Sequence, residues 1–158
     1  MKKYILTFAL SLFTIISISA QKTNNANISK LYNQYIAIKN ALAADNADQT
    51  SKAALDFIKI AGTVDAKLLS EGNINTLRKD ATAISEARTI QKQREYFYNL
   101  SDNMIAVAKK FKLSDKSVYV QYCPMAEGNW LSNENKIVNP YYGSKMLSCG
   151  SVKSEIKN

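Results

Sequence analysis

The stretch "ISEARTIQKQREYF", from Ile84 to Phe97, decides how the helical part of this chain folds. One stripe of apolar residues ends at Ile84, and another begins thirteen positions later, at Phe97. At about 100° per residue, this separation rotates the second stripe by well over half a turn. Because one straight helix cannot bury both stripes against one partner, the pattern predicts a break near residues 87–89, with Thr89 as the N-cap of the next helix.

Four such stripes run through the middle of the chain, and each has the alternating spacings of three and four that place residues on one helical face. They are Ile28, Leu31, Tyr35, Ile38 and Leu42; Ala54, Phe57, Ala61, Val64 and Leu68; Ile74, Leu77, Ala81 and Ile84; and Phe97, Leu100, Met104, Val107 and Phe111. The short connections between them predict a mainly α fold, an antiparallel up-and-down four-helix bundle over residues 28–112. Met104 lies on a stripe and is therefore expected in the core, not as a metal ligand.

The segment "QKQREYF" contains two neighbouring residues of opposite charge. Arg94 and Glu95 are predicted to lie at the surface or to form one local ion pair. The alternative is a structural role against the C-terminal part of the chain.

The N-terminus has the pattern of a secretory signal peptide over residues 1–20. Lys2 and Lys3 precede the apolar run "YILTFALSLFTIISI", and the small residue Ala20 stands at the expected cleavage point. Residues 21–27 are polar and predict a disordered lead-in, with Asn27 as the N-cap of the first helix. No other stretch approaches the roughly 20 apolar residues of a membrane span. We therefore expect an exported protein with no span after cleavage, periplasmic in a Gram-negative cell or else secreted.

The chain is basic, with 21 Lys and Arg against 13 Asp and Glu and a net charge of +8. Loss of Lys2 and Lys3 would lower this charge to +6. The remaining lysines are scattered, as on solvated helix faces, and export argues against a nucleic-acid partner.

Residues 113–158 differ in composition and residue pattern from the helical part. Both prolines and three of the five glycines lie here. The alternating segment "KSVYVQY" predicts a short strand, and "NPYYG", from Asn139 to Gly143, predicts a turn. These features predict an irregular C-terminal lobe within a single domain that spans residues 28–158.

Sulfur is concentrated in two short segments of this lobe, "CPM" and "MLSC". Cys123 and Met125 are two residues apart and would share a face in an extended segment. Met146 and Cys149 are three apart and would share one helical turn. Thiolate and thioether ligands in a chain without histidine favour Cu(I) or Ag(I). Trp130 could lie over the bound cation and add a cation–π interaction.

A disulfide between Cys123 and Cys149 is the alternative, because export implies an oxidising compartment. Closing this loop would stabilise the fold by about 3.5 kcal/mol. Met125, Met146 and Trp130 would then be packing residues, and a reversible disulfide in the metal-free protein would reconcile both interpretations. Catalysis is not expected, since a cysteine nucleophile has no histidine base here and no glycine-rich phosphate loop is present.

The chain resembles a small helical domain of unknown function from exported bacterial proteins. The resemblance rests on "YNQYIAIKNALAADN", "QREYFYNLS", "VYVQYCPMA", "NWLS" and "IVNPYYGSKMLSCG", within residues 32–150. That domain occurs alone after a signal peptide, or fused to the C-terminus of periplasmic adaptor subunits of copper/silver efflux pumps of the resistance-nodulation-division type. Its pattern falls here on Cys123, Pro124, Met125, Trp130, Asn139, Pro140, Tyr141, Gly143, Met146, Cys149 and Gly150.

The resemblance implies a metal-related role by association with such pumps. Together with the sulfur ligands it leads us to expect a non-enzymatic domain that buffers Cu(I) or Ag(I) or hands it to an efflux adaptor or pump. In this account Cys123, Met125, Met146 and Cys149 are the metal ligands, and residues 139–143 form the turn that brings the two sulfur segments together. A disulfide-stapled interaction module without metal is the other expectation.

Overall fold

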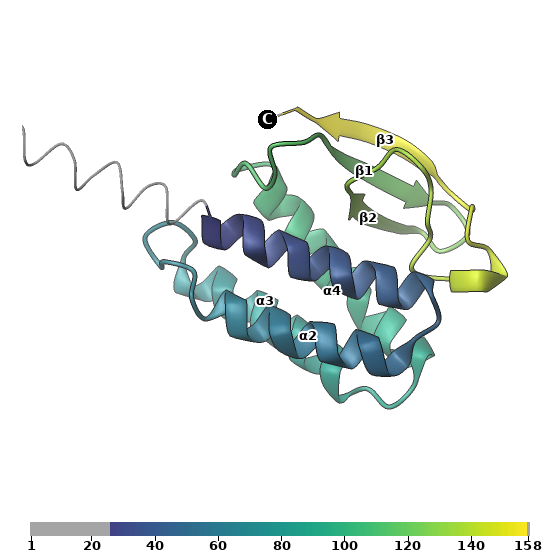
Figure 1. Cartoon of the computed structure of the whole chain (residues 1–158), viewed down its shortest axis with the longest axis horizontal. Coiled ribbons are helices and arrows are strands. Elements are labelled where there is room, and N and C mark those ends of the chain that lie inside the picture. Colours follow the sequence, from purple (N-terminus) through teal and green to yellow (C-terminus); the bar gives the residue numbers. More distant parts are fainter. Residues whose placement is uncertain (1–25, 158) are drawn as a thin grey trace, which may run out of the picture.

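The computed structural model describes residues 26–157, which form four helices followed by a small antiparallel sheet (Figure 1). The first helix spans residues 26–43, and α2 (Ala47–Ala61), α3 (Glu71–Glu86) and α4 (Ile90–Ala108) follow. The chain is mainly helical, as predicted. The predicted signal peptide and residues 21–25 of the lead-in lie outside the described residues.

Side-chain caps fix where the last three helices begin. Asn46, Ser70 and Thr89 each accept a hydrogen bond from the backbone N–H three residues later, at the start of α2, α3 and α4. Such caps satisfy N–H groups that have no partner within the helix. The predicted break between the third and fourth stripes is confirmed, because α3 ends at Glu86 and Thr89 is extended. Asn27 is not a cap, since helix is already present at residue 26, and its side chain instead donates to the Thr63 carbonyl.

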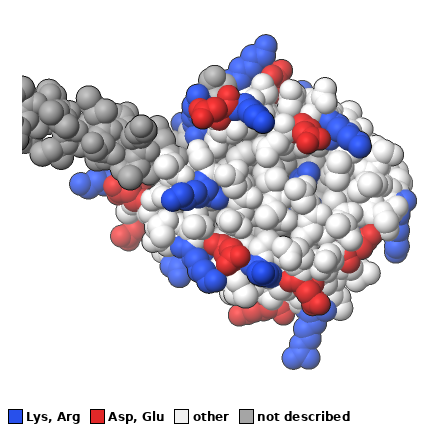
Figure 2. Space-filling model, viewed as in Figure 1, with Lys and Arg blue, Asp and Glu red and all other residues white. Residues whose placement is uncertain are grey.

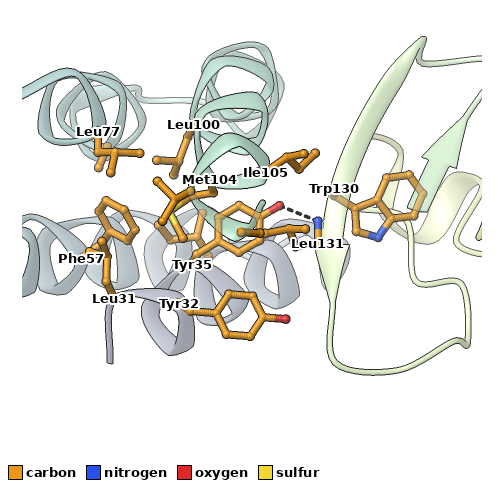
Figure 3. Close-up of a cluster of buried hydrophobic side chains, with 14 of the residues drawn as sticks. Leu31, Tyr32, Tyr35, Phe57, Leu77, Leu100, Met104, Ile105, Trp130 and Leu131 are labelled. Atoms are coloured by element: carbon orange, nitrogen blue, oxygen red, sulfur yellow. Dashed lines mark hydrogen bonds between the residues drawn. The ribbon is translucent and has the colours of Figure 1, made fainter. Parts of the chain in front are cut away.

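The predicted apolar stripes form the core between the helices (Figure 3). Every stripe residue is buried except Leu68 and Phe111, which are half-buried. Val64 and Leu68 lie beyond α2, because this helix ends at Ala61 and Gly62 caps it. Met104 is fully buried among the helices, as predicted.

The C-terminal lobe is a three-stranded antiparallel sheet rather than an irregular lobe with one strand. Its strands are β1 (Val118–Cys123), β2 (Gly128–Ser132) and β3 (Ser151–Ile156), in the order β2-β1-β3. The predicted strand is β1. The sequence missed β3 because this edge strand is exposed along almost its whole length and carries no apolar alternation.

A chain of buried hydrogen bonds attaches the sheet to the helices, and Figure 3 shows the one between Tyr35 and Leu131. The Leu131 N–H in β2 donates to the Tyr35 hydroxyl at 2.9 Å, which lies 2.7 Å from the Ser101 Oγ of α4. Ser101 in turn donates to the Asn129 carbonyl at 2.8 Å. The chain thus runs from β2 through two helices and back to β2.

Arg94 makes the second attachment between the helices and the C-terminal lobe. The prediction that it lies at the surface is wrong. Its guanidinium is buried and donates to the carbonyl oxygens of Leu42 at 2.8 Å and Pro140 at 2.9 Å. It also pairs with the Asp45 carboxylate, which accepts from the Ser144 N–H at 2.9 Å. The structural role against the lobe is therefore the correct interpretation for Arg94, whereas Glu95 lies at the surface, as predicted, and pairs there with Lys92.

The surface carries scattered charge. Figure 2 shows Lys and Arg interspersed with Asp and Glu on the face that it presents. This distribution agrees with the expectation of solvated lysines. Within residues 26–157, no helix is long and apolar enough to cross a membrane.

Tyr35→Phe should lower the free energy of unfolding by about 1–3 kcal/mol, because it leaves the buried Leu131 N–H without a partner. Tyr32→Phe is the matched control, since the Tyr32 hydroxyl is equally buried but has no hydrogen-bond partner among residues 26–157. We expect the control to leave stability unchanged or to raise it, because it removes an unpartnered buried hydroxyl instead of creating an unpartnered group. Urea unfolding of the three proteins measures both values, and equal effects of the two substitutions would contradict the hydrogen-bond chain.

The Asp45 ion pair should make stability depend on acid pH. Hydrogen bonds from Ser144 and Arg94 lower the pKa of Asp45 from 3.8 to about 2. A lowered folded-state pKa stabilises the fold above about pH 4, and this contribution is lost as the pH falls toward 2. Asp45→Asn should therefore cost about 1 kcal/mol at pH 7, a value reduced by solvent screening of this partly exposed carboxylate.

The difference between wild type and Asp45→Asn should shrink as unfolding is measured from pH 5 to pH 2. Asp56→Asn is the control, because Asp56 pairs with Lys59 on the exposed face of α2. A pH-independent difference for Asp45→Asn would refute the role of this carboxylate.

Candidate functional site

Cys123 is the last residue of β1 and is fully buried. The turn of residues 124–127 joins it to β2, and Pro124 restricts the backbone at the first position of this turn. The backbone N–H groups of Met125 and Ala126 both hydrogen-bond to the Cys123 sulfur. The local fold therefore directs two positive dipole ends at this thiol, which favours its thiolate form.

Asn139 organises the second sulfur segment. Its side-chain oxygen accepts from the backbone N–H groups of Tyr141 and Tyr142 at 2.8 and 3.3 Å, which forms a turn where "NPYYG" predicts one. Its side-chain nitrogen donates to the Cys149 carbonyl at 2.9 Å, and its backbone N–H donates to the Leu147 carbonyl at 2.8 Å. Asn139 is fully buried and closes the loop that carries Met146 and Cys149.

Two glycines of this segment are required by their surroundings. Gly143 has a φ of +57°, and a Cβ there would collide with the Arg94 guanidinium and the Asp45 carboxylate. Gly150 has a φ of +138°, and a Cβ there would lie 2.8 Å from the Tyr122 carbonyl and 2.9 Å from the Trp130 ring. Glycine adopts this backbone region without a steric cost.

The two segments bring the cysteine sulfurs together. The Sγ atoms of Cys123 and Cys149 lie 2.6 Å apart, and both residues are free thiols in this structure. A disulfide bond is about 2.05 Å long, so a two-electron oxidant that removes both thiol hydrogens would join them with only a small movement. Cys149 is half-buried and gives the pair its access to solvent.

The two thiols differ in acidity. Burial raises the pKa of Cys123, but hydrogen bonds from the Cys149 thiol and from two backbone N–H groups outweigh it, so this pKa is lowered. The hydrogen bond to Cys123 raises the pKa of Cys149. Cys123 is therefore the sulfur that ionises first.

The two methionines lie at the surface of the lobe. The Met125 side chain is 63% exposed at the turn after β1, and the Met146 side chain is 36% exposed. Met146 follows a short 3-10 helix, Gly143–Lys145, and its carbonyl accepts from the Cys149 N–H at 3.0 Å. The expectation that Met146 and Cys149 share an α-helical turn is thus wrong. A hydrogen-bonded turn joins them instead.

Trp130 packs beneath this loop. It is fully buried, lies opposite Gln121 in the sheet, and therefore shares a sheet face with Cys123. Its ring meets Tyr141 edge-on at 6.0 Å and would contact any side chain placed at Gly150. Figure 3 shows Trp130 on the side of its strand away from Tyr35.

Two tyrosines that the sequence did not single out also hold the turn after Cys123. The Tyr98 hydroxyl donates to the Ala126 carbonyl at 2.8 Å, and the Tyr142 hydroxyl donates to the Met125 carbonyl at 2.9 Å. They come from α4 and from the second sulfur segment. No local sequence signal distinguishes them from the other tyrosines of the chain.

Thiols and thioethers are soft ligands, so this donor set would suit a soft metal in preference to a hard one. Among the described residues, no group of three His, Cys, Asp or Glu side chains gathers as a metal site would require. The available ligands are two thiols with two thioethers on the same segments, which suit a monovalent soft ion. A tetrahedral ion with bonds of about 2.3 Å needs sulfurs about 3.8 Å apart. The cysteine pair would therefore open by roughly 1 Å, which the exposed position of Cys149 allows.

Oxidation should join the pair and stabilise the lobe. Cys123 and Cys149 enclose a loop across 26 positions, for which a disulfide contributes about 3.5 kcal/mol. Cys149→Ser should lose this stabilisation under oxidising conditions, and a reducing agent should remove most of the difference from wild type. Guanidinium unfolding with and without reductant tests this, and a difference that persists in full under reduction would contradict it.

The family model described as "Protein of unknown function (DUF3347)" matches residues 31–116. The match covers α2, α3 and α4 and more than half of the chain, but it ends before β1 and the cysteines. No curated protein and no solved structure matches the chain. The chain belongs to this family of proteins of unknown function, DUF3347.

Proposed function

We propose that this protein is an exported, non-enzymatic carrier of Cu(I) or Ag(I). Reduced Cys123 and Cys149 bind one ion as thiolates, and Met125 and Met146 complete the site as thioether ligands. The protein buffers the ion or passes it to a heavy-metal efflux adaptor or pump. The observation that carries this proposal is the pair of solvent-accessible thioethers on the two segments that meet at the cysteines.

Packing does not account for the more exposed methionine. Met104 shows how the chain uses methionine in its core, where no part of the side chain reaches solvent. Met125 instead leaves 63% of its side chain exposed, although an apolar residue gains stability from burial. A thioether in this position remains available to a metal ion that arrives from solvent.

The softness of the ligands, and not their charge, favours a monovalent cation. Two thiolates around one such ion leave a net negative charge, which is costly in a partly buried site. The backbone N–H groups of Met125 and Ala126 offset part of this charge at Cys123. Among the described residues, no carboxylate joins the cysteines in a cluster that would suit a divalent ion.

Export and the efflux partner rest on the sequence. The N-terminal pattern of residues 1–20 supports export, and the resemblance to adaptor-fused domains supports the partner. The antiparallel up-and-down arrangement of the helices is part of the same proposal. In this arrangement the bundle is the support that holds the sulfur lobe at one side.

A disulfide-stapled interaction module without metal is the second candidate. The sulfur separation of 2.6 Å favours it, because the two thiols already lie closer than a bound ion would allow. The two functions exclude each other in any one molecule, since a disulfide removes both thiolate ligands. The redox state of the cysteines therefore decides between them.

Met125→Leu and Met146→Leu should each weaken Cu(I) binding by about tenfold or more while apo stability changes little, because leucine conserves volume. Met104→Leu is the matched control and should bind like wild type. The measurement is anaerobic competition of the reduced mature protein against a Cu(I) chelator. The same reduced wild type should gain about 2.7 kcal/mol of stability at a hundredfold excess of free ion over Kd.

The stapled module gives the opposite pattern. In that case all three methionine variants match wild type with and without metal, and reduced wild type does not compete with the chelator. Such a result would overturn the carrier proposal.

A further inference from the structure

A polar pocket lies between the first helix and the end of β2 with the loop that follows it. Its volume is about 130 Å³, and its polar lining consists of Lys39 and Asn40 from the helix, Ser132 from the end of β2, and Asn133, Glu134 and Lys136 from the loop. It shares no residue with the cysteine–methionine site. The inference drawn from it does not depend on metal binding.

Lys39 is the unusual member of this pocket. The residue is only 5% exposed, and its ammonium group, which is not among the fully enclosed polar atoms, has no hydrogen-bond partner within residues 26–157. Burial lowers its pKa to about 8, an effect that the charge of Glu134 partly opposes. Buried ammonium groups normally have a hydrogen-bonded anionic partner, because desolvation of the charge costs several kcal/mol. Residues 26–157 supply no such hydrogen bond.

Hydrogen bonds from the sheet hold the loop of residues 133–136, which lines the pocket opposite Lys39. The buried Gln121 side-chain nitrogen lies within hydrogen-bonding distance of three carbonyl oxygens, of Glu134 at 2.8 Å, Asn135 at 3.2 Å and Lys136 at 3.1 Å. The Ser132 Oγ accepts from the Glu134 N–H at 3.2 Å. One wall of the pocket is therefore preorganised, which reduces the entropy lost when a ligand binds.

The charge and the volume of the pocket limit which ligands it can bind. Lys39 and Lys136 against Glu134 leave one net positive charge, which a monoanion neutralises, whereas a dianion would leave the pocket with a net negative charge. The amide groups of Asn40 and Asn133 can donate hydrogen bonds to oxygen acceptors. The volume of about 130 Å³ corresponds to about four waters at about 30 Å³ each, which is enough for a small carboxylate.

We propose that this pocket binds the carboxylate group of a small molecule, with the Lys39 ammonium as its buried anchor. Lys136 and the two asparagine amides complete the contacts from the rim. The carboxylate supplies the hydrogen-bonded anion that Lys39 lacks within the chain.

Acetate is the probe. Amide NMR spectra of the reduced, metal-free mature protein are recorded during titration with sodium acetate, against sodium chloride at equal ionic strength. We expect saturable shifts with a millimolar Kd, confined to residues 36–40 and 132–138. Phosphate at pH 7.5, largely a dianion, should bind at least several-fold more weakly.

Lys39→Met should abolish the acetate response, and Lys30→Met, on an exposed position of the same helix, should preserve it. Lys136→Met changes an exposed residue, leaves the fold intact and should weaken acetate several-fold. The proposal is overturned if acetate acts no differently from chloride, if Lys136→Met binds as wild type does, or if a folded Lys39→Met protein keeps the response. Tighter binding of phosphate than of acetate would overturn the carboxylate assignment.

Discussion

The buried guanidinium of Arg94 is the interaction on which the rest of the structure depends. It donates to the carbonyl of Leu42 at the end of the first helix, to the carboxylate of Asp45, and to the carbonyl of Pro140 in the lobe. The Asp45 carboxylate also accepts a hydrogen bond from the Ser144 N–H. Gly143 has no Cβ atom that would collide with the Arg94 and Asp45 side chains. The loop after Pro140 is thereby held against α4. This loop carries Cys149, so its attachment sets where the second thiol meets the first.

The periodic part of the fold could be predicted from the sequence. Apolar spacing identified four helices, and the change of phase between Ile84 and Phe97 located the break that Thr89 caps. The sheet was harder, because β3 is exposed and polar and owes its conformation to hydrogen bonds with β1. Arg94 was misjudged for a related reason. A charged residue in a helical segment predicts a surface position, and only the loops that meet it in space reveal its burial.

The sequence selects the residues of the candidate site but does not predict how they are arranged. Residue type alone selected the two cysteines and the two methionines, since sulfur donors are rare in this chain. Their arrangement depends on contacts distant in sequence, such as the hydrogen bond from Asn139 to Cys149 and those from Tyr98 and Tyr142 to the turn after Cys123. A spacing of three suggested an α-helical turn for Met146 and Cys149. The 3-10 helix before them ends too early for that.

The cysteine pair has two chemical fates, a disulfide and a metal complex, and only the reduced form can bind an ion. X-ray absorption at the copper edge of anaerobically loaded, desalted protein tests the central claim most directly. The carrier account predicts about one Cu(I) per chain surrounded only by sulfur, with two thiolate bonds and at least one longer thioether bond, which is lost in the Met125→Leu, Met146→Leu double variant. Loss of copper on desalting, or a first shell of nitrogen and oxygen, would contradict it.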